Sequence, residues 1–149
     1  MVYKYSFENY NKESMARGCS VNSAISTKKS VETARLIRGK KVETAISMLE
    51  KVVEQKLAVP YKRYKTEMAH RKGKGIDTGG YPVNVAKEFL RVLKAVKKNA
   101  LEKELSSSNL FIIAISVRQG VGRYHNGRHV GRKMKSTNLE IIVGEKKKK

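Results

Sequence analysis

Apolar residues recur at three- and four-residue steps in three segments of the chain, a spacing typical of amphipathic helices. The first of these segments begins near Ser26 or Thr27, either of which can cap a helix by accepting a bond from a free backbone N–H. Its apolar positions are Val31, Ala34 and Ile37. Gly39 follows, at the point where a left-handed residue commonly ends a helix.

The other two helical segments are longer and more clearly amphipathic. The second is expected to cover residues 42–57 and to end before Pro60. The third is expected to begin at Pro82, because proline is favoured in the first turn of a helix. It should end at 106–109, a run of serine and asparagine. In both segments the apolar stripe indicates one face packed on a core.

Two apolar, β-branched runs, 110–117 and 139–143, indicate the strands of a β-hairpin. The connection between them is basic and glycine-rich, and no Asp or Glu occurs between Glu104 and Glu140. Hairpin loops usually have two to five residues, so one this long is either functional or disordered. If each arm stays extended for about eight more residues, the ribbon projects roughly 25–27 Å, at about 3.3 Å per residue. Like charges along it repel, so we expect a polyanion to surround it; the alternative is a mobile basic loop without a single partner.

Three further segments lack a strong pattern. Tyr3, Tyr5 and Phe7 alternate, which fits either a short edge strand or an extended tail lying on a partner. Residues 61–80 are basic and rich in glycine, which indicates an irregular connection and a second phosphate-binding segment. Residues 144–149 are expected to form a disordered charged tail.

Together these elements predict an α+β fold, with three helices packed on a small antiparallel sheet and a long basic β-hairpin protruding from it. The 149 residues fit one domain. We expect its globular body at about 20–108, the extended hairpin at about 109–143 and the tail at 144–149.

The charge balance points to a polyanionic partner. The chain has 33 Lys and Arg against 13 Asp and Glu, a formal net charge of +20. Nucleic acid is the first candidate, because each neutralised phosphate releases condensed counterions. A membrane surface fits less well, since the chain has no Trp and few aromatic anchors. A single cysteine, no apolar leader and no apolar run of about 20 residues predict a soluble cytoplasmic protein.

No residue cluster indicates catalysis, a metal or a cofactor. His125 and His129 have helical ligand spacing, but their segment is too rich in glycine to be helical and offers no third ligand. The segment 122–129 has the glycine spacing of a phosphate-binding loop, but it has Arg and His where Lys and Ser or Thr are required. A metal-dependent nuclease needs clustered carboxylates, which the basic stretch lacks. We therefore expect a binding protein and not an enzyme.

The hairpin insert carries side chains suited to RNA. Arginine presents a planar fork that matches phosphate and stacks on bases, and Tyr124 and His125 can stack on an unpaired base near the tip. The arginines spaced along the insert are Arg118, Arg123, Arg128 and Arg132.

Several short motifs follow one another in an order that resembles a known family. They are Ile25-Ser-Thr-Lys-Lys29, Ala34-Arg-Leu-Ile-Arg-Gly-Lys40, Val59-Pro60, Tyr81-Pro82, Lys98-Asn-Ala100, Gly127-Arg-His-Val-Gly-Arg132 and Leu139-Glu-Ile-Ile-Val143. With them, residues 20–145 resemble the large-subunit ribosomal protein family numbered twenty-two in bacteria and archaea and seventeen in eukaryotes. The insert around 73–81 resembles the archaeal and eukaryotic branch. The family's usual Pro-Arg-Ala is replaced at 126–129 by Asn-Gly-Arg-His.

The resemblance implies a structural constituent of the large ribosomal subunit that binds large-subunit ribosomal RNA of the 23S type and supports assembly. It also implies that the hairpin lines the polypeptide exit tunnel, with neighbouring ribosomal proteins and the nascent chain as further partners. We expect no homo-oligomer. The basic segments and the resemblance together assign RNA binding to Ser26, Lys28, Arg35, Arg38, Lys40, Lys41, Lys62, Arg63, Arg71, Lys72, Lys74, Arg118, Arg123, Tyr124, Arg128, Arg132, Lys133 and Lys135. The alternative is a free-standing RNA-binding protein or RNA chaperone.

Overall fold

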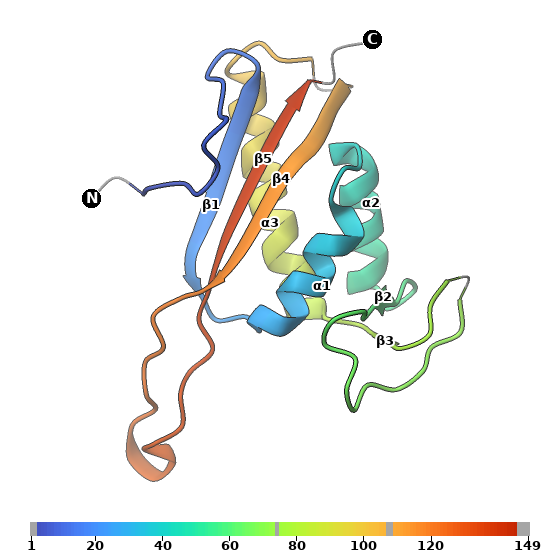
Figure 1. Cartoon of the computed structure of the whole chain (residues 1–149), viewed down its shortest axis with the longest axis vertical. Helices are drawn as coiled ribbons and strands as arrows, with labels where there is room; N and C mark the ends of the chain where they lie inside the picture. Colours follow the sequence, from blue (N-terminus) through green and yellow to red (C-terminus); the bar gives the residue numbers. More distant parts are fainter. Residues whose placement is uncertain (1–2, 74, 107–108, 146–149) are drawn as a thin grey trace.

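The computed structural model describes residues 3–73, 75–106 and 109–145, and a three-stranded antiparallel sheet in the order β1-β5-β4 lies at its centre (Figure 1). Its strands are β1 (Met15–Ser23), β4 (Leu110–Gln119) and β5 (Thr137–Glu145). The central strand pairs with both neighbours, so that Val143 lies between Ala16 and Ile112.

Strand β1 was not predicted, because its segment reads as polar and the globular body was expected to begin near residue 20. The strand has small residues where it meets the helical layer: Ala16 is fully buried, and Ser20 is nearly so. At Gly18, an added Cβ would lie 2.5 Å from Val96 Cγ2 on the third helix. Small residues permit close helix packing but carry a weak strand signal.

The C-terminal strand extends beyond its expected end at Val143. Gly144 pairs with Phe111 and Met15, and Glu145 pairs with Leu110. The expected charged tail therefore does not begin at residue 144, and its remaining residues, 146–149, lie outside the described part of the chain.

The three expected helices are present as α1 (Thr27–Ile37), α2 (Val42–Val53) and α3 (Val83–Leu101). Helix α3 packs against β1 and β5, α1 packs against β4, and α2 packs mainly against α3. The core between them includes Phe89, Leu93, Ile37, Leu49 and Leu139, all of which are fully buried. The predicted α+β fold is confirmed.

The helix ends differ from expectation in three places. Helix α3 begins at Val83, with Pro82 as its N-cap, and ends at Leu101, before the expected 106–109. Ser26 is the N-cap of α1, but its side chain makes no capping bond; its carbonyl instead accepts bonds from the backbone and side chain of Ser30. Gly39 has φ +73°, as expected after a helix. Helix α2 ends at Val53 and not at Leu57, because Gln55 adopts φ 60° and turns the chain well before Pro60.

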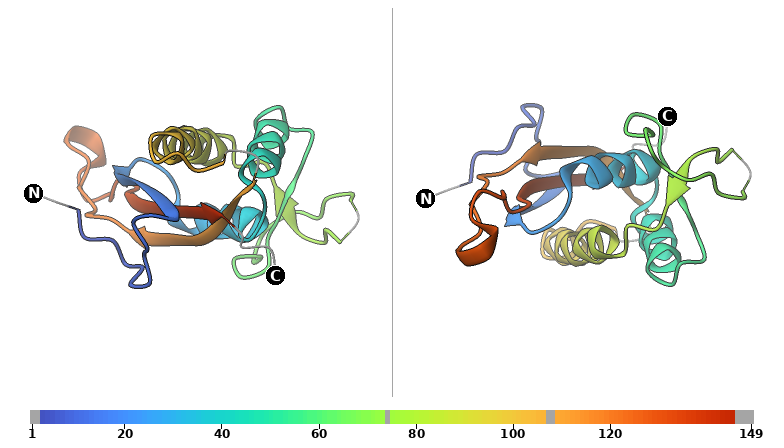
Figure 2. Two further views of the ribbon diagram at one scale, coloured as in Figure 1. Left: turned by 90° about the horizontal axis from the view of Figure 1, so that it is seen from above. Right: turned by 90° about the horizontal axis from the view of Figure 1, so that it is seen from below.

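The N-terminal residues lie along the sheet face opposite to α3 (Figure 2). Tyr3–Phe7 forms no strand, so the edge-strand alternative is wrong. The segment is held by the buried Glu140 of β5, which accepts bonds from the Tyr3 hydroxyl at 2.8 Å and from the backbone N–H of Ser6 at 3.0 Å. Residues 3–7 therefore cover the chain's own sheet.

Two loops leave the body at the end opposite to the C-terminus (Figure 1). Residues 61–78, the basic loop, connect the two-residue strands β2 (Val59–Pro60) and β3 (Gly79–Gly80), which pair with each other. Residues 120–136, the hairpin loop, connect β4 and β5 and include a short 3-10 turn, η2 (Gly127–His129). Regular pairing of the hairpin stops at Gln119 and Thr137, and only an isolated bridge joins Tyr124 to Lys133 further out. The arms run together as expected, but not as a continuous β-ribbon.

Candidate nucleic-acid interface

The hairpin loop presents its cationic side chains to solvent. These exposed residues are Arg123, Arg128, Arg132, Lys133 and Lys135. Tyr124 is 56% exposed and lies beneath the Lys133 ammonium, which is 5.5 Å from the ring centroid. Since the loop contains no carboxylate, none of these charges is neutralised from within it. The arrangement can meet several phosphates at once.

The base of the hairpin loop is fixed by Asn22, a residue that the sequence reasoning missed. Its Oδ1 accepts bonds from the Val121 backbone N–H and the Ser136 hydroxyl, both at 3.1 Å. Its own backbone N–H donates to Asn138 Oδ1 at 2.8 Å. Asn22 has φ 52°, a conformation that asparagine tolerates better than most residues. An Asn near the end of a strand carries only a weak sequence signal for this role.

Gly120 is required where the hairpin arms separate. A Cβ at this position would collide with the Ser136 hydroxyl and with Asn22 Oδ1. Gly120 also donates its backbone N–H to Ser136 O at 3.0 Å. The glycine therefore allows the two arms and Asn22 to meet in one compact junction.

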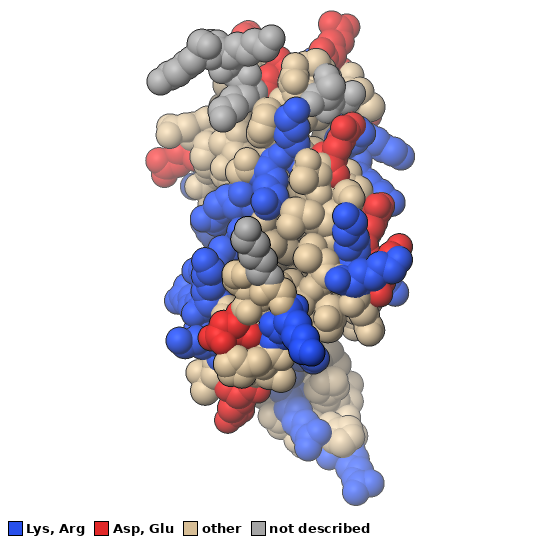
Figure 3. Space-filling view, turned by 90° about the vertical axis from the view of Figure 1, so that its right-hand side faces the viewer, with Lys and Arg blue, Asp and Glu red and all other residues tan. Residues whose placement is uncertain are grey.

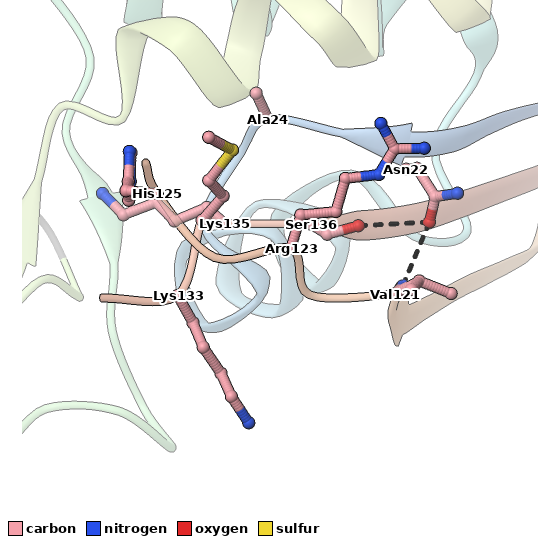
Figure 4. Close-up of a pocket in the computed structure, with 9 residues that line it drawn as sticks. Asn22, Ala24, Val121, Arg123, His125, Lys133, Lys135 and Ser136 are labelled. Atoms are coloured by element: carbon pink, nitrogen blue, oxygen red, sulfur yellow. Dashed lines mark hydrogen bonds between the residues drawn. The ribbon is translucent and has the colours of Figure 1, made fainter. Parts of the chain in front are cut away.

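A hollow of about 570 Å³ opens beside this junction (Figure 4). Arg123, Lys133 and Lys135 contribute to its wall, together with His125. In Figure 4 the Arg123 guanidinium lies near Asn22, whereas the Lys133 ammonium points away from the other labelled side chains. Three predicted RNA-binding residues thus meet at one concave surface.

The basic loop is anchored to the body by Glu32, which the sequence reasoning also missed. This fully buried carboxylate accepts bonds from three successive backbone N–H groups, those of Lys62 at 3.2 Å, Arg63 at 2.8 Å and Tyr64 at 2.9 Å. Burial alone raises the pKa of Glu32, but these three donors and the Arg35 charge outweigh it and hold the pKa below its usual value. Glu32 stays ionised and fixes the start of the loop.

With its backbone held inward, the basic loop directs its charged side chains outward. Lys62, Arg63, Arg71 and Lys72 are all exposed. The Arg63 guanidinium lies 5.3 Å from the Tyr64 ring, and that of Arg71 lies 5.4 Å from the Tyr81 ring. Figure 3 shows Lys and Arg side chains spread over this side of the molecule and along the protruding hairpin. Lys74, another predicted site residue, lies outside the described residues.

The predicted cluster at the end of α1 is tied partly to the body. Arg38 is exposed, yet its Nη2 donates to Ile115 O at 3.0 Å. Arg35 Nη1 lies 3.5 Å from Glu32, and the Lys41 ammonium lies 5.8 Å from the Phe111 ring. The helix end is joined to β4 by two backbone bonds: Gly39 donates its N–H to Ile112 O, and the Lys40 carbonyl accepts from the Ile112 N–H. These residues hold α1 on the sheet, and RNA contact by them stays a prediction.

The remaining predicted residues fall in two places. Ser26 and Lys28 lie at the start of α1, where the Lys28 ammonium is 5.9 Å from the Tyr64 ring. They are therefore brought next to the basic loop. Arg118 is exposed near the end of β4. Burial alone raises the pKa of Glu140, but the bonds from Ser6 and Tyr3, assisted by the Arg118 charge, hold this pKa below its usual value.

The described part of the chain does not indicate other kinds of site. No group of three or more His, Cys, Asp or Glu side chains there is placed to hold a metal ion. None of the helices in these residues has the length and apolar character needed to cross a membrane.

Comparison with known proteins gives a consistent result. The family model described as "Ribosomal protein L22p/L17e" matches residues 19–143. The protein "Large ribosomal subunit protein uL22" of Nanoarchaeum equitans is 39% identical, with 99% of this chain and 85% of that protein covered. The proteins of the same name from Archaeoglobus fulgidus and Ignicoccus hospitalis are 39% and 37% identical, and 94% and 96% of their lengths are covered. The chain therefore belongs to the ribosomal protein L22p/L17e family, as a member of its archaeal type.

Proposed function

We propose that this chain is a structural constituent of the large subunit of the cytoplasmic ribosome, that it binds large-subunit ribosomal RNA and that it supports subunit assembly. As a member of a family of ribosomal proteins, it is a structural component and not an enzyme. Relatives at 37–39% identity carry the name of a large-subunit protein over nearly the whole chain. The observation that carries the RNA-binding part is the exposed, carboxylate-free hairpin loop.

Two cationic surfaces, on loops that lie on opposite sides of one end of the molecule, support a protein that ties RNA segments together (Figure 2). The basic loop is positioned by Glu32 before any partner arrives. Beyond its base, the two arms of the hairpin loop are joined by the bonds from His125 N–H to Arg132 O and from Met134 N–H to Arg123 O, and each residue that becomes ordered against RNA costs roughly 1–2 kcal/mol. Many phosphate contacts must offset this cost, so binding weakens steeply with salt.

The protruding hairpin also supports a place in the wall of the polypeptide exit tunnel. The hairpin loop extends beyond the sheet and the helices, away from the end where α3 leads into β4 (Figure 1). A body that docks on the subunit surface by α1 and the basic loop would direct this loop into the RNA. Its outermost residues would then lie where neighbouring proteins or a nascent chain can contact them.

Sedimentation of the endogenous protein through a sucrose gradient that contains magnesium tests this proposal. We expect nearly all of the protein to migrate with large subunits and to stay with them through a moderate salt wash. A slow or broad profile, separate from the large subunit, would contradict the proposal and favour a free-standing RNA-binding protein or RNA chaperone.

A further inference from the structure

We propose that three adjoining hollows form one groove for an unpaired RNA strand, running from the base of the hairpin loop, past the start of α1, to the basic loop. This inference rests on the proposed function and adds to it a site and a class of ligand. The hollow beside the hairpin loop and a second of about 250 Å³ share Ala24 and Lys135 as lining residues. The second hollow and a third of about 170 Å³ share Ser26 and Lys29. We call the three together the acid-free groove.

The charge of the groove distinguishes it from other depressions on the surface. Among the described residues, no Asp or Glu lines any of its three hollows. Two other hollows of the molecule do include a carboxylate, Glu140 in one and Asp77 in the other. The cations of the groove are Arg123, Lys135, Lys28 and Lys29; Lys133 also lines it, but its ammonium points away and lies over the Tyr124 ring. Positive charge is thus continuous along a concave path, as the spaced phosphates of a strand require.

The other lining residues favour unpaired bases over a duplex. Met134 and Val121 provide apolar wall in the first hollow, and the rings of Tyr81 and Tyr64 line the second and third hollows. Base faces stack on such rings only when they are not already stacked within a helix. Duplex RNA offers mainly phosphates and 2′-hydroxyl groups to a surface, and it needs no recessed aromatic wall.

Hydrogen-bonding groups line the groove beside these rings. Asn84 lines the second hollow and is exposed, and Thr66 lines the third. Amide and hydroxyl groups can donate to and accept from base edges. An RNA strand in the groove would therefore contact cations, apolar side chains and polar groups, which together suit the phosphates, base faces and base edges of single-stranded RNA.

Binding of fluorescein-labelled uridylate decamer to the full chain, titrated at several salt concentrations, tests the groove. The groove variant carries Lys29→Gln and Lys135→Gln. The matched control carries Lys87→Gln and Lys94→Gln, which remove the same charge from exposed positions on α3 that line none of the three hollows. For a single strand, each lost phosphate contact lowers the salt slope of log K by about 0.7. We expect the groove variant to lose about 1.4 of slope and about ten-fold in affinity, and the control to lose little of either.

Equal losses for the groove and control variants would overturn the groove, because binding would then follow net charge alone. A loss of the same size for a duplex of matched length would overturn it as well. Circular dichroism of both variants verifies that they are folded. The proposed function is tested separately by sedimentation: wild-type protein that migrates apart from large subunits contradicts that function. A groove variant that migrates with large subunits, yet binds the decamer as the wild type does, contradicts the groove alone.

Discussion

The basic loop and the hairpin loop carry the same kind of charge but are held in opposite ways. The basic loop is closed by the β2–β3 pair and anchored by Glu32, a buried carboxylate inside the body. The hairpin loop is held at its base by Asn22 and Ser136, through neutral hydrogen bonds, and contains no carboxylate. The body therefore fixes the basic loop through a buried charge and the hairpin loop only at its base, through neutral groups.

Because of this difference, changes in the basic loop should affect stability, whereas changes in the outer hairpin loop should affect binding. Contacts of the basic loop reach into the core, so breaking them should lower the free energy of unfolding. Contacts of the outer hairpin loop are with solvent, so removing its charges should change RNA binding and little else. The expected effects on stability decrease from the carboxylate anchors to the hairpin arginines.

The largest loss of stability is expected from Glu32→Ala. The change leaves three backbone N–H groups, those of Lys62, Arg63 and Tyr64, without their acceptor. Removing one partner from a buried charged network costs about 3 kcal/mol. Urea denaturation of the full chain measures this loss, and hydrogen exchange should show faster exchange in the basic loop but not in the hairpin loop.

Glu50→Ala is the matched control, because Glu50 is an exposed carboxylate on α2. It should change the free energy of unfolding by less than about 0.5 kcal/mol. A similar small change for Glu32→Ala would contradict the view that this carboxylate anchors the basic loop.

Acid should weaken the body through Glu88, where α3 meets the end of β1. The bond from Arg91 lowers the pKa of Glu88 to about 2; burial opposes this, and the Ser20 and Ser23 hydroxyls assist it. Because this folded pKa lies below the ordinary 4.5, the stabilisation is complete above about pH 4.5 and is lost as the pH falls through about 2. The Arg91 side chain is 68% exposed, so solvent weakens its interaction with Glu88, and we expect the ionised Glu88 to add about 1–2 kcal/mol to the free energy of unfolding.

Glu88→Gln isolates this contribution. Chemical denaturation at several pH values should give the wild type a higher free energy of unfolding than the variant above about pH 4.5, and this difference should shrink toward pH 2. A difference in free energy of unfolding that stays constant over this range would show that ionisation of Glu88 does not stabilise the fold.

A smaller effect is expected at the hairpin junction from Gly120→Ala. The added methyl group would collide with Ser136 and Asn22, and relief of such overpacking costs about 1–2 kcal/mol. Gly122→Ala is the control two residues away, since its nearest neighbour would be Lys133 Cδ at 3.9 Å, an ordinary contact. Thermal unfolding of both variants measures the difference, and equal melting temperatures would contradict a tight junction.

Periodicity predicted the helices and the two C-terminal strands because large apolar residues mark their buried faces. Strand β1 was missed because Ala16, Gly18 and Ser20 meet the helical layer with little apolar surface. The early end of α2 was missed because the positive φ of Gln55 leaves no signal in the residue type.

For the candidate site, the sequence predicted the cationic residues but not the residues that position them. Sequence reasoning found the cationic side chains, because clusters of Lys and Arg in glycine-rich segments can be identified without knowledge of the fold. It missed Glu32 and Asn22, which act through tertiary contacts with residues 30 and 99 positions or more away. It also missed Lys29 as a lining residue of the groove, because concavity depends on how α1 packs against its neighbours.

The smallest effect on stability is expected from Arg128→Ala combined with Arg132→Ala. Both side chains are exposed on the hairpin loop, so the free energy of unfolding should change by less than about 0.5 kcal/mol. RNA binding should weaken, and the salt slope of log K should fall by about 1.4–1.8, because two phosphate contacts are lost. The control pair Arg128→Lys and Arg132→Lys keeps the charges but not the planar forks, so it should retain the slope and lose affinity only where a fork is used. Incorporation of the alanine pair into large subunits at the wild-type level would show that Arg128 and Arg132 are not needed to anchor the protein, and that other cationic residues of the body hold it in place.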